Sequence, residues 1–401
     1  MTPSEQLKQL NAIFDRGLIV DVLPTKDAFI REALSRPLNI YGGFDPTNTA
    51  LHLGHAQNFM VMEDLRKLGH KVFVLFGDFT ACIGDPSAQK SARRPLTRAQ
   101  TIANAKDWIN QVRNLMDFDA AVNPPHIVFN SAWLDKLTIA EFLELQSQTT
   151  VQRMLERDMF QKRIAENKPV HLHEFSYPLF QAFDSVALNA DVEVCGTDQT
   201  FNALLGRQFV KTKLGKEKFC LIAQLMNHPV TGEPMMSKSR GIGVFLNTGA
   251  ETMFGQIMAM PDEMIDRLLR WNTRIPLAEI EALDIVGNPR DAKMFAAVEI
   301  VEIFHGTAAA EKARAHFIDT FSKKDFPADA PEISLGKTPA ALFDIVKACM
   351  PGKSNGEIRR LIAQNAASVN GVKCADERQS WDVSAPLEVK IGKLGFFKVV
   401  R

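Results

Sequence analysis

The stretch that decides the fold runs from residue 38 to residue 78 and reads LNIYGGFDPTNTALHLGHAQNFMVMEDLRKLGHKVFVLFGD. It opens with a short apolar run that breaks on glycines, and a turn follows at residues 45–49. Residues 52–68 have the apolar spacing of a helix, and residues 72–78 form an apolar run typical of a strand buried on both faces. Strand, turn, helix and strand within about 40 residues predict a βαβ unit in a parallel sheet.

In the rest of the chain, the residue pattern predicts a mainly helical middle part, and this pattern changes near residue 338 to one of shorter helices and strands. The elements expected outside the βαβ unit are helices at 5–20, 96–170 and 250–325, and strands at 126–130, 219–225, 367–372, 387–389 and 395–400. Lys323–Glu332 is polar and contains two prolines, which makes it the best candidate for a linker.

The composition is that of an ordinary globular protein. With 401 residues, 46% of them hydrophobic, the chain is long enough for two or three domains. Its 47 Lys and Arg balance 47 Asp and Glu, which excludes a uniformly basic nucleic-acid binder. The five cysteines form no CxxC pair, so reduced thiols in a cytoplasmic protein are expected rather than disulfides or a zinc site. The sequence shows no signal peptide or membrane span, and we expect no membrane partner.

Two histidines, His52 and His55, stand three residues apart at the start of the predicted helix. A helix N-terminus presents free N–H groups and attracts phosphates, and side chains at this spacing lie on one face. Gly54 between them leaves room for an adenine ring beside the backbone. The alternatives are two surface histidines or a metal pair. Two histidines without a Cys or carboxylate partner make a poor metal site, so we expect no metal ligands here.

A second short motif, Met236-Ser237-Lys238-Ser239, lies near the end of the predicted α/β region. Lys238 stands between two hydroxyls in a segment followed by Gly241, so it can fold over a triphosphate and neutralise charge on a leaving pyrophosphate. A polar loop is the better interpretation of this motif alone. Its combination with the two histidines, in this order, favours a nucleotide-using enzyme.

The two motifs resemble the HIGH and KMSKS signatures of the class I aminoacyl-tRNA synthetases. Four further segments are similar, in order, to the bacterial tyrosyl-tRNA synthetases: Gly43-Phe-Asp-Pro-Thr47, Ile83-Gly-Asp-Pro-Ser87, Tyr177-Pro-Leu-Phe-Gln-Ala-Phe-Asp184 and Gly196-Thr-Asp-Gln199. Residues 338–401 resemble the small RNA-binding domain of this family. The resemblance therefore covers nearly the whole chain.

The resemblance implies an α/β fold with a Rossmann-like parallel-sheet catalytic domain, an all-helical domain and a small α+β RNA-binding domain. The catalytic domain would span residues 1–235 and include a helical insertion or dimer-interface segment. A KMSKS-like loop and a helical anticodon-binding domain would occupy 236–325. A linker at 326–337 and the RNA-binding domain at 338–401 would follow. The family is dimeric, so a homodimer is expected, with the helices within 120–170 as the candidate interface.

The tyrosine pocket of the family falls on residues with fitting chemistry. Tyr41 and Asp184 would bind the phenolic hydroxyl, because a hydroxyl and a carboxylate satisfy both its donor and acceptor sides. Tyr177, Asp85 and Gln181 would hold the α-ammonium group, with Asp85 as the charged partner. Taken singly, Asp85 also suits a turn, Asp184 a surface helix and Tyr177 the core. The chain has only 2 Tyr against 27 Phe, and both tyrosines fall in this implied pocket.

The resemblance also implies an ATP site. Asp198 would bind the ribose, and Gln199 would lie beside the substrate carboxylate and the α-phosphate. Thr47 and His52 would contact the γ-phosphate, and His55 would lie on the ribose side. The implied ATP-binding residues are Gly43, Asp45, His52, Gly54, His55, Asp198 and Lys238, and the implied catalytic residues are Thr47, His52, His55 and Lys238.

The implied reaction has two steps. The carboxylate of tyrosine attacks the α-phosphate of ATP, and the tyrosyl-adenylate then esterifies the terminal adenosine of tRNA(Tyr). Positioning and electrostatics would supply the catalysis, with Mg²⁺ on the phosphates of ATP and no tightly bound cofactor. For tRNA we expect phosphate contacts from Lys353, Arg359 and Arg360. Two further basic groups, at 90–98 and 207–218, are candidates, although a solvated charged face is the common alternative.

Three positions depart from the family pattern. Met235 stands in place of the usual first Lys of the KMSKS motif, Gly42 follows Tyr41, and Phe183 replaces a frequent tyrosine. Lys90, Arg93 and Arg94 are the cations expected to share the task of Lys238. The rival interpretations are a tryptophanyl-tRNA synthetase, a small adenylyltransferase, and a non-catalytic RNA-binding protein that keeps the synthetase fold. Met235 is the only support for the last of these.

Overall fold

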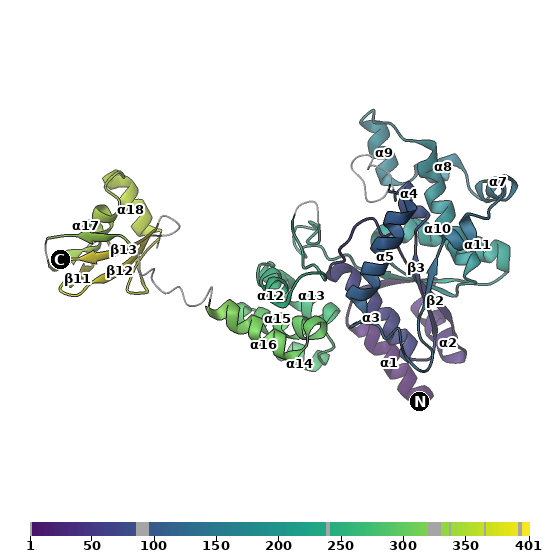
Figure 1. Ribbon diagram of the computed structural model, residues 1–401, viewed down its shortest axis with the longest axis horizontal. Coiled ribbons are helices and arrows are strands. Elements are labelled where there is room, and N and C mark those ends of the chain that lie inside the picture. Colours follow the sequence, from purple (N-terminus) through teal and green to yellow (C-terminus); the bar gives the residue numbers. More distant parts are fainter. Residues whose placement is uncertain are drawn as a thin grey trace. The chain divides into compact units, whose positions relative to one another are not determined.

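The computed structural model describes residues 2–85, 96–237, 241–319, 330–336, 338–364, 366–391 and 395–401 (Figure 1). The contacts divide the chain into two compact units, Met1–Ala315 and His316–Arg401. Within the described residues, no helix has both the length and the apolar character needed to cross a membrane. The candidate linker at 323–332 lies largely outside the described residues.

A six-stranded sheet forms the centre of the first unit. Its strands are β1 (Ile19–Leu23), β2 (Asn39–Phe44), β3 (Lys71–Phe76), β4 (His126–Phe129), β5 (Val192–Gly196) and β6 (Phe219–Ala223). They lie in the order β1-β6-β5-β2-β3-β4, and all neighbours are parallel except β1 and β6. The predicted parallel sheet is therefore confirmed, with one antiparallel strand at its edge.

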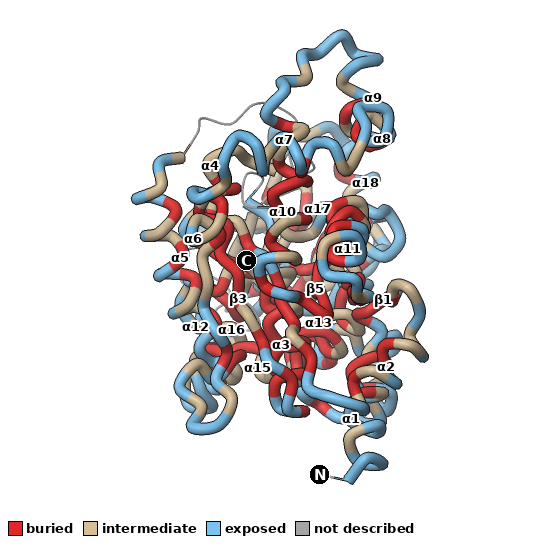
Figure 2. Tube along the Cα trace, turned by 90° about the vertical axis from the view of Figure 1, so that its right-hand side faces the viewer, coloured by how far each residue is buried: buried red, intermediate tan, exposed pale blue. Residues whose placement is uncertain are grey.

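The predicted βαβ unit consists of β2, helix α3 (Leu53–Lys67) and β3, with Tyr41 paired to Phe73 in the register. Strand β2 pairs with β3 on one side and with β5 on the other. The strand order reverses direction between β2 and β5. Open α/β sheets bind their ligands at the position where the strand order reverses, outside the carboxyl ends of the strands. Figure 2 shows buried segments concentrated along β3, β5 and α3.

Helices surround this sheet and fill the rest of the first unit. They are α1 (Pro3–Asp15), α2 (Lys26–Ser35), α4 (Thr80–Ile83), α5 (Arg98–Val112), α6 (Ser131–Leu134), α7 (Ile139–Ser147), α8 (Val151–Leu155), α9 (Asp158–Ala165), α10 (Ser176–Ala187), α11 (Thr200–Leu214), α12 (Ala250–Met258), α13 (Ile265–Asn272), α14 (Leu277–Glu281), α15 (Pro289–His305) and α16 (Thr307–Phe317). Single 3-10 turns are η2 (Leu172–Phe175), η3 (Thr197–Gln199) and η5 (Asp262–Met264).

The opening helix is shorter than predicted. We expected it to reach residue 20, but α1 ends at Asp15 and β1 begins at Ile19. Gly17 has a φ of +71°, a left-handed conformation that glycine adopts without steric cost and that ends the helix. The apolar residues after Gly17 continue the sheet, because β1 pairs with β6.

The second unit has its own sheet and core. A five-stranded sheet joins β7 (Glu332–Ser334), β9 (Ala367–Val369), β10 (Val372–Cys374), β12 (Leu387–Ile391) and β13 (Gly395–Val400) in the order β10-β9-β12-β13-β7. Helices α17 (Leu342–Cys349) and α18 (Asn355–Ala363) and a two-stranded pair of β8 (Ala340–Ala341) with β11 (Ser380–Trp381) complete it. Ile345, Ile358, Val389 and their apolar neighbours form one buried cluster, so the unit is an α+β domain with its own core.

Candidate functional site

A cavity of about 680 Å³ lies at the carboxyl ends of β2 and β5, where the winding of the sheet changes. It is lined by predicted residues from five separate stretches of the chain. These are Tyr41, Gly43, Asp45, Thr47, His52, Gly54, His55, Asp85, Tyr177, Gln181, Asp184, Asp198 and Gln199. Lys238, Lys90, Arg93 and Arg94 lie outside the described residues.

Local structure explains how these side chains reach one cavity. Tyr177, Gln181 and Asp184 lie on α10 at spacings of four and three residues, which places them on one helix face. Strand β2 and the turn after it bring Tyr41 and Asp45 to the same place.

Two glycines allow close packing around the cavity, one behind its wall and one in its lining. A Cβ on Gly42 would lie 2.7 Å from Sδ of Met62 on α3, so the departure from the family at this position suits the packing of α3 on β2. A Cβ on Gly77 would lie 2.0 Å from Oδ1 of Asp45, so the turn after β3 needs a glycine beside that carboxylate.

One end of the cavity is formed by Tyr41 and Asp184. Both are buried, with Asp184 only 3% exposed, so this aspartate is not the surface acid that its helix alone also allowed. Trp133 Nε1 donates to Asp184 Oδ1 at 2.7 Å, and Asn130 Nδ2 donates to Oδ2 at 3.3 Å. Burial raises the pKa of Asp184 and that of Tyr41 well above their usual values. This end therefore holds a carboxyl group and a phenol that are both shielded from water, and the hydrogen bonds from Trp133 and Asn130 oppose the effect of burial on Asp184.

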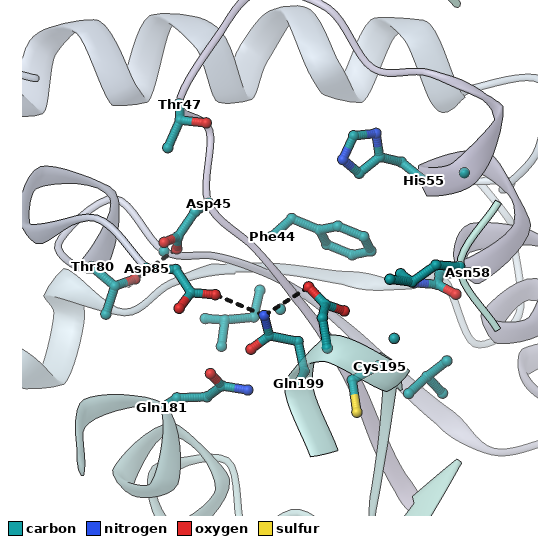
Figure 3. A pocket seen from close by; sticks show the side chains of 18 of the residues that line it. Phe44, Asp45, Thr47, His55, Asn58, Thr80, Asp85, Gln181, Cys195 and Gln199 are labelled. Carbon is teal, nitrogen blue, oxygen red and sulfur yellow. Dashed lines mark hydrogen bonds between the residues drawn. The ribbon is translucent and has the colours of Figure 1, made fainter. Parts of the chain in front are cut away.

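Several carboxylates line the rest of the cavity. Tyr177 Oη donates to Asp45 Oδ2 and Thr80 Oγ1 donates to Oδ1, both at 2.8 Å. Burial raises the pKa of Asp45 to about 7 in spite of these two hydrogen bonds. Figure 3 shows Gln199 between two carboxylates, and its Nε2 donates to Asp85 at 2.7 Å and to Asp198 at 3.2 Å. This clustering of acidic groups suits a cationic ligand.

Gln181 also lines the cavity. Its Nε2 donates to Glu193 Oε1 at 3.0 Å, and its Oε1 accepts from Asn202 Nδ2 at 2.8 Å. The same Asn202 amide donates to Gln199 Oε1 at 2.9 Å. The amide orientations of Gln181 and Gln199 are thus set by neighbours from other elements.

The two histidines stack at the start of α3, with ring centroids 3.8 Å apart. Burial lowers the pKa of His52 to about 4, and burial together with His52 lowers that of His55 well below its usual value, so both rings are neutral at pH 7. His52 Nδ1 is buried and has no hydrogen-bond partner among the described residues. A Cβ on Gly54 would lie 3.1 Å from that atom, so this glycine makes room for the His52 ring as well as lining the cavity.

The segments around the second motif lie beside the histidines. His52 bridges to Phe245, and Leu53 N donates to Val244 O at 3.1 Å. Ser237 N donates to Ile242 O at 2.7 Å, and Ser237 also lines the cavity. The stretches on both sides of residues 238–240 are therefore fixed next to the N-terminus of α3.

Several residues of the site were missed by sequence reasoning. Asn130, which follows β4, and Trp133 on α6 hold Asp184, and Glu193 on β5 lines the cavity. None belongs to a short motif, and each reaches the site only through the sheet order. Ser185 is next to Asp184 in the sequence and lies 2.8 Å from the Tyr41 hydroxyl.

The second basic group, at 207–218, is not the free surface patch we considered. Lys218 is fully buried and pairs with Glu193, so it cannot face tRNA. The other members are partly neutralised: Arg207 pairs with Glu217, Lys213 with Glu144 and Lys216 with Asp191.

The candidate RNA contacts lie in the second unit, on or just before α18. Lys353 pairs with Glu357 at 3.1 Å, and Arg359 pairs with Glu377 at 2.9 Å. Arg360 is exposed and has no ion-pair partner among the described residues. It is therefore the most available of the three cations.

Comparisons with known proteins show the family of this chain. The family model described as tRNA synthetases class I (W and Y) matches residues 33–322. The tyrosine–tRNA ligase of Aquifex aeolicus is 38% identical over 400 residues, which cover 100% of both chains. That of Shewanella oneidensis is 40% identical over 398 residues, which cover 98% of each.

Solved structures show the same fold. A C-terminally truncated mitochondrial tyrosyl-tRNA synthetase of Aspergillus nidulans has a TM-score of 0.67 at 23% identity, covering 80% of this chain and 99% of that one. The tyrosyl-tRNA synthetase of Archaeoglobus fulgidus, solved with L-tyrosine, has a TM-score of 0.58 at 18% identity, covering 78% and 100%. The full-length relatives are tyrosine–tRNA ligases, which decides against the tryptophanyl and adenylyltransferase alternatives. The chain thus belongs to the class I aminoacyl-tRNA synthetases, as a member of the bacterial tyrosine–tRNA ligases.

Proposed function

We propose that the cavity at the ends of β2 and β5 is where this ligase activates tyrosine with ATP. The observation that carries the proposal is the arrangement of its polar groups. A buried hydroxyl and carboxyl group, Tyr41 and Asp184, form one part of the cavity wall, and the carboxylates Asp45 and Asp85 line another part with Tyr177. Tyrosine has a phenol at one end and an ammonium group at the other, so it matches both.

Tyrosine would lie with its phenol between Tyr41 and Asp184. Asp184 accepts the phenolic proton, and Tyr41 donates to the phenolic oxygen, so both sides of the hydroxyl are satisfied. The ammonium group would lie near Asp85, Tyr177 and Gln181. Asp85 gives a charge-assisted hydrogen bond there, which is stronger than one between neutral partners.

ATP would occupy the part of the cavity beside α3. The neutral His52 ring and Thr47 both line the cavity, and both would contact the triphosphate. His55 and Asp198 would lie on the ribose side, and Gly43, Asp45 and Gly54 would allow close approach of the nucleotide. Lys238 would neutralise charge on the phosphates. Mg²⁺ would enter bound to the phosphates, because it favours hard oxygen ligands.

The first step needs no protein nucleophile or general base. The tyrosine carboxylate is already an anion, and its attack on the α-phosphorus releases pyrophosphate. The protein holds the two reactants in line and stabilises charge on the leaving group, and Gln199 beside the carboxylate would help to align it. In the second step the terminal adenosine hydroxyl of tRNA(Tyr) attacks the carbonyl of the adenylate and releases AMP.

We propose that the second unit holds the tRNA backbone. Arg360, Arg359 and Lys353 lie close together in sequence at α18, and residues 338–401 contain ten Lys and Arg against six Asp and Glu. Cations at this density favour phosphate contacts, which position RNA without reading its sequence.

We propose that the working form is a homodimer in the cytoplasm, where all five thiols, which are free, stay reduced. Five large apolar side chains between residues 139 and 172 are between 51% and 86% exposed: Ile139, Leu143, Val151, Ile164 and Leu172. A second copy of the chain would bury them. Sedimentation of the purified protein tests this, and a monomer at micromolar concentration would contradict it.

Tyrosine-dependent exchange between ATP and pyrophosphate tests the proposed site. The wild-type protein should exchange only with tyrosine present. The Tyr41→Phe and Asp184→Asn variants should show a lowered kcat/KM for tyrosine in this exchange while their KM for ATP stays unchanged. A protein that binds tRNA but shows no exchange would be the non-catalytic alternative.

A further inference from the structure

A buried ion pair lies directly behind the Tyr41 end of the cavity. Lys218, immediately before β6, is 0% exposed and pairs with Glu193 on β5, which is 2% exposed. Lys218 Nζ also donates to Ser185 Oγ at 2.8 Å, and Ser185 Oγ lies 2.8 Å from Tyr41 Oη. Removing charges from water is costly, and a buried pair is weak evidence for stability alone. This placement therefore calls for a functional explanation.

The proton positions in this network follow from counting donors. An ammonium group has three protons and no acceptor. Those of Lys218 are directed to Glu193 Oε2, to Ser185 Oγ and, at 3.4 Å, to Ala203 O. Ser185 must therefore accept from Lys218. A Cβ on Gly206 would lie 2.6 Å from Lys218 Nζ, so α11 leaves space for the ammonium group there.

Ser185 has one proton of its own, and within the part of the chain that the structure describes Tyr41 Oη is its remaining hydrogen-bond partner. If Tyr41 donated to Ser185 instead, the Ser185 proton would be left buried without an acceptor, which is unfavourable. The favoured arrangement has Lys218 donating to Ser185 and Ser185 donating to Tyr41. The proton of Tyr41 then points away from Ser185, toward the cavity and the Glu193 carboxylate that lines it.

This direction is the one that a tyrosine substrate requires. When Asp184 accepts the phenolic proton, the phenolic oxygen offers only lone pairs, so Tyr41 must donate to it. A Tyr41 hydroxyl that donated backwards would present a lone pair to the substrate and repel it. Phenylalanine would leave the Tyr41 proton and the Asp184 carboxylate unpaired.

We propose that Ser185 and Lys218 are positioning residues that hold Tyr41 as a hydrogen-bond donor and thereby help to select tyrosine over phenylalanine. The inference rests on the proposed tyrosine site. Glu193 keeps Lys218 charged, and its carboxylate also accepts a hydrogen bond from Gln181 Nε2 at 3.0 Å. The Lys218–Glu193 ion pair therefore also orients the side-chain amide of Gln181, which would lie near the ammonium group of the substrate. The specificity of the pocket thus depends on residues that do not touch the substrate.

The test is a double-mutant cycle on kcat/KM for tyrosine and phenylalanine in pyrophosphate exchange. Ser185→Ala should lower kcat/KM for tyrosine by about 3- to 10-fold, the usual effect of one lost hydrogen bond. It should leave kcat/KM for phenylalanine and the KM for ATP unchanged. In a Tyr41→Phe background Ser185→Ala should have no further effect, because the hydroxyl that it directs is gone.

Matched variants separate this role from a packing role. Cys220→Ala changes a buried side chain of β6, which contacts the same Ala203 carbonyl, and should leave the tyrosine-to-phenylalanine ratio unchanged. Ser185→Thr keeps the hydroxyl and should restore the ratio, and Ser185→Cys, close to serine in size, replaces Ser185→Ala if the alanine variant unfolds. Lys218→Met with Glu193→Gln removes both charges together and should lower the ratio as Ser185→Ala does.

The tyrosine-to-phenylalanine ratio of kcat/KM in these variants separates a failure of the proposed site from a failure of the inference. If Tyr41→Phe leaves the ratio unchanged, the proposed tyrosine site is wrong. If Tyr41→Phe lowers the ratio but Ser185→Ala leaves it unchanged, the proposed tyrosine site stands and the inference about Ser185 and Lys218 is overturned. The same conclusion follows if Ser185→Ala lowers the ratio equally in the wild-type and Tyr41→Phe backgrounds.

Discussion

Asp184→Asn is the substitution that separates the chemistry of the phenol end from its shape. Asparagine has the same size, and its amide oxygen can still accept from Trp133 Nε1, which lies 2.7 Å from Asp184 Oδ1. The change removes the negative charge that would accept the phenolic proton. It also removes a buried carboxyl whose pKa is raised by burial, so the fold should be retained.

The expected loss follows from the kind of hydrogen bond removed. A hydrogen bond to a charged group contributes about 1.5–3 kcal/mol, which corresponds to roughly 10- to 150-fold in kcat/KM for tyrosine. Phenylalanine has no hydroxyl and should lose nothing. Tyrosyl-tRNA synthetases are the standard example of such discrimination, at about 10⁵-fold against phenylalanine. The variant should therefore keep part of the preference, through Tyr41.

The assay is pyrophosphate exchange with each amino acid at saturating ATP, alongside thermal unfolding. We expect a midpoint no lower than that of the wild type, an unchanged KM for ATP, and a tyrosine-to-phenylalanine ratio lowered by at least about tenfold. An unchanged ratio in a folded variant would refute the assignment of Asp184. A parallel fall for both amino acids would point to a general disturbance of the site.

Three further predictions concern other parts of the chain. Burial raises the Asp45 pKa to about 7, so the folded protein keeps the carboxyl proton at pH values where the unfolded chain has lost it. The contribution of Asp45 to the free energy of unfolding therefore falls as the pH rises, by about 2–3 kcal/mol between pH 5 and pH 7. In urea titrations at several pH values, the unfolding free energy of Asp45→Asn should lack this decrease. The same pH dependence in the wild type and the variant would contradict the prediction. His52→Ala should slow adenylate formation by about 10²-fold or more without changing tyrosine affinity by equilibrium dialysis; equal losses would refute its role. Arg360→Ala should reduce the salt dependence of tRNA binding by about one phosphate contact, whereas an unaltered salt slope would exclude it.

The parts of the fold that the sequence predicted are those encoded locally. The β2–α3–β3 unit was found because its apolar pattern changes period within one stretch, and the histidines at the start of α3 lie where that pattern placed them. The sheet order was beyond such reasoning. Strand β1 joins β6 as an antiparallel edge through long-range pairing, and no local pattern indicates that partner.

The predicted site residues came from motifs, and the missed ones have none. Asn130 and Trp133 reach Asp184 from a separate strand and helix. Lys218 stands in a charged stretch that suggested a surface, and its burial is decided by Glu193 on the neighbouring strand. Long-range pairing, rather than residue type, determines which of these groups serve the cavity.

The two tyrosines of the chain now have definite positions. Tyr41 and Tyr177 both line the cavity, one at the Asp184 end and the other hydrogen-bonded to Asp45. The low tyrosine content does not by itself indicate the substrate. It does mean that no other tyrosine of this chain can complicate phenol-specific probes of the site.

A crystal structure of the protein with bound tyrosine tests the central claim most directly. The account predicts the phenolic oxygen within hydrogen-bond distance of both Tyr41 Oη and the Asp184 carboxylate, and the ammonium group beside Asp85. Tyrosine bound elsewhere, or in this cavity with its phenol turned toward Asp85, would contradict it.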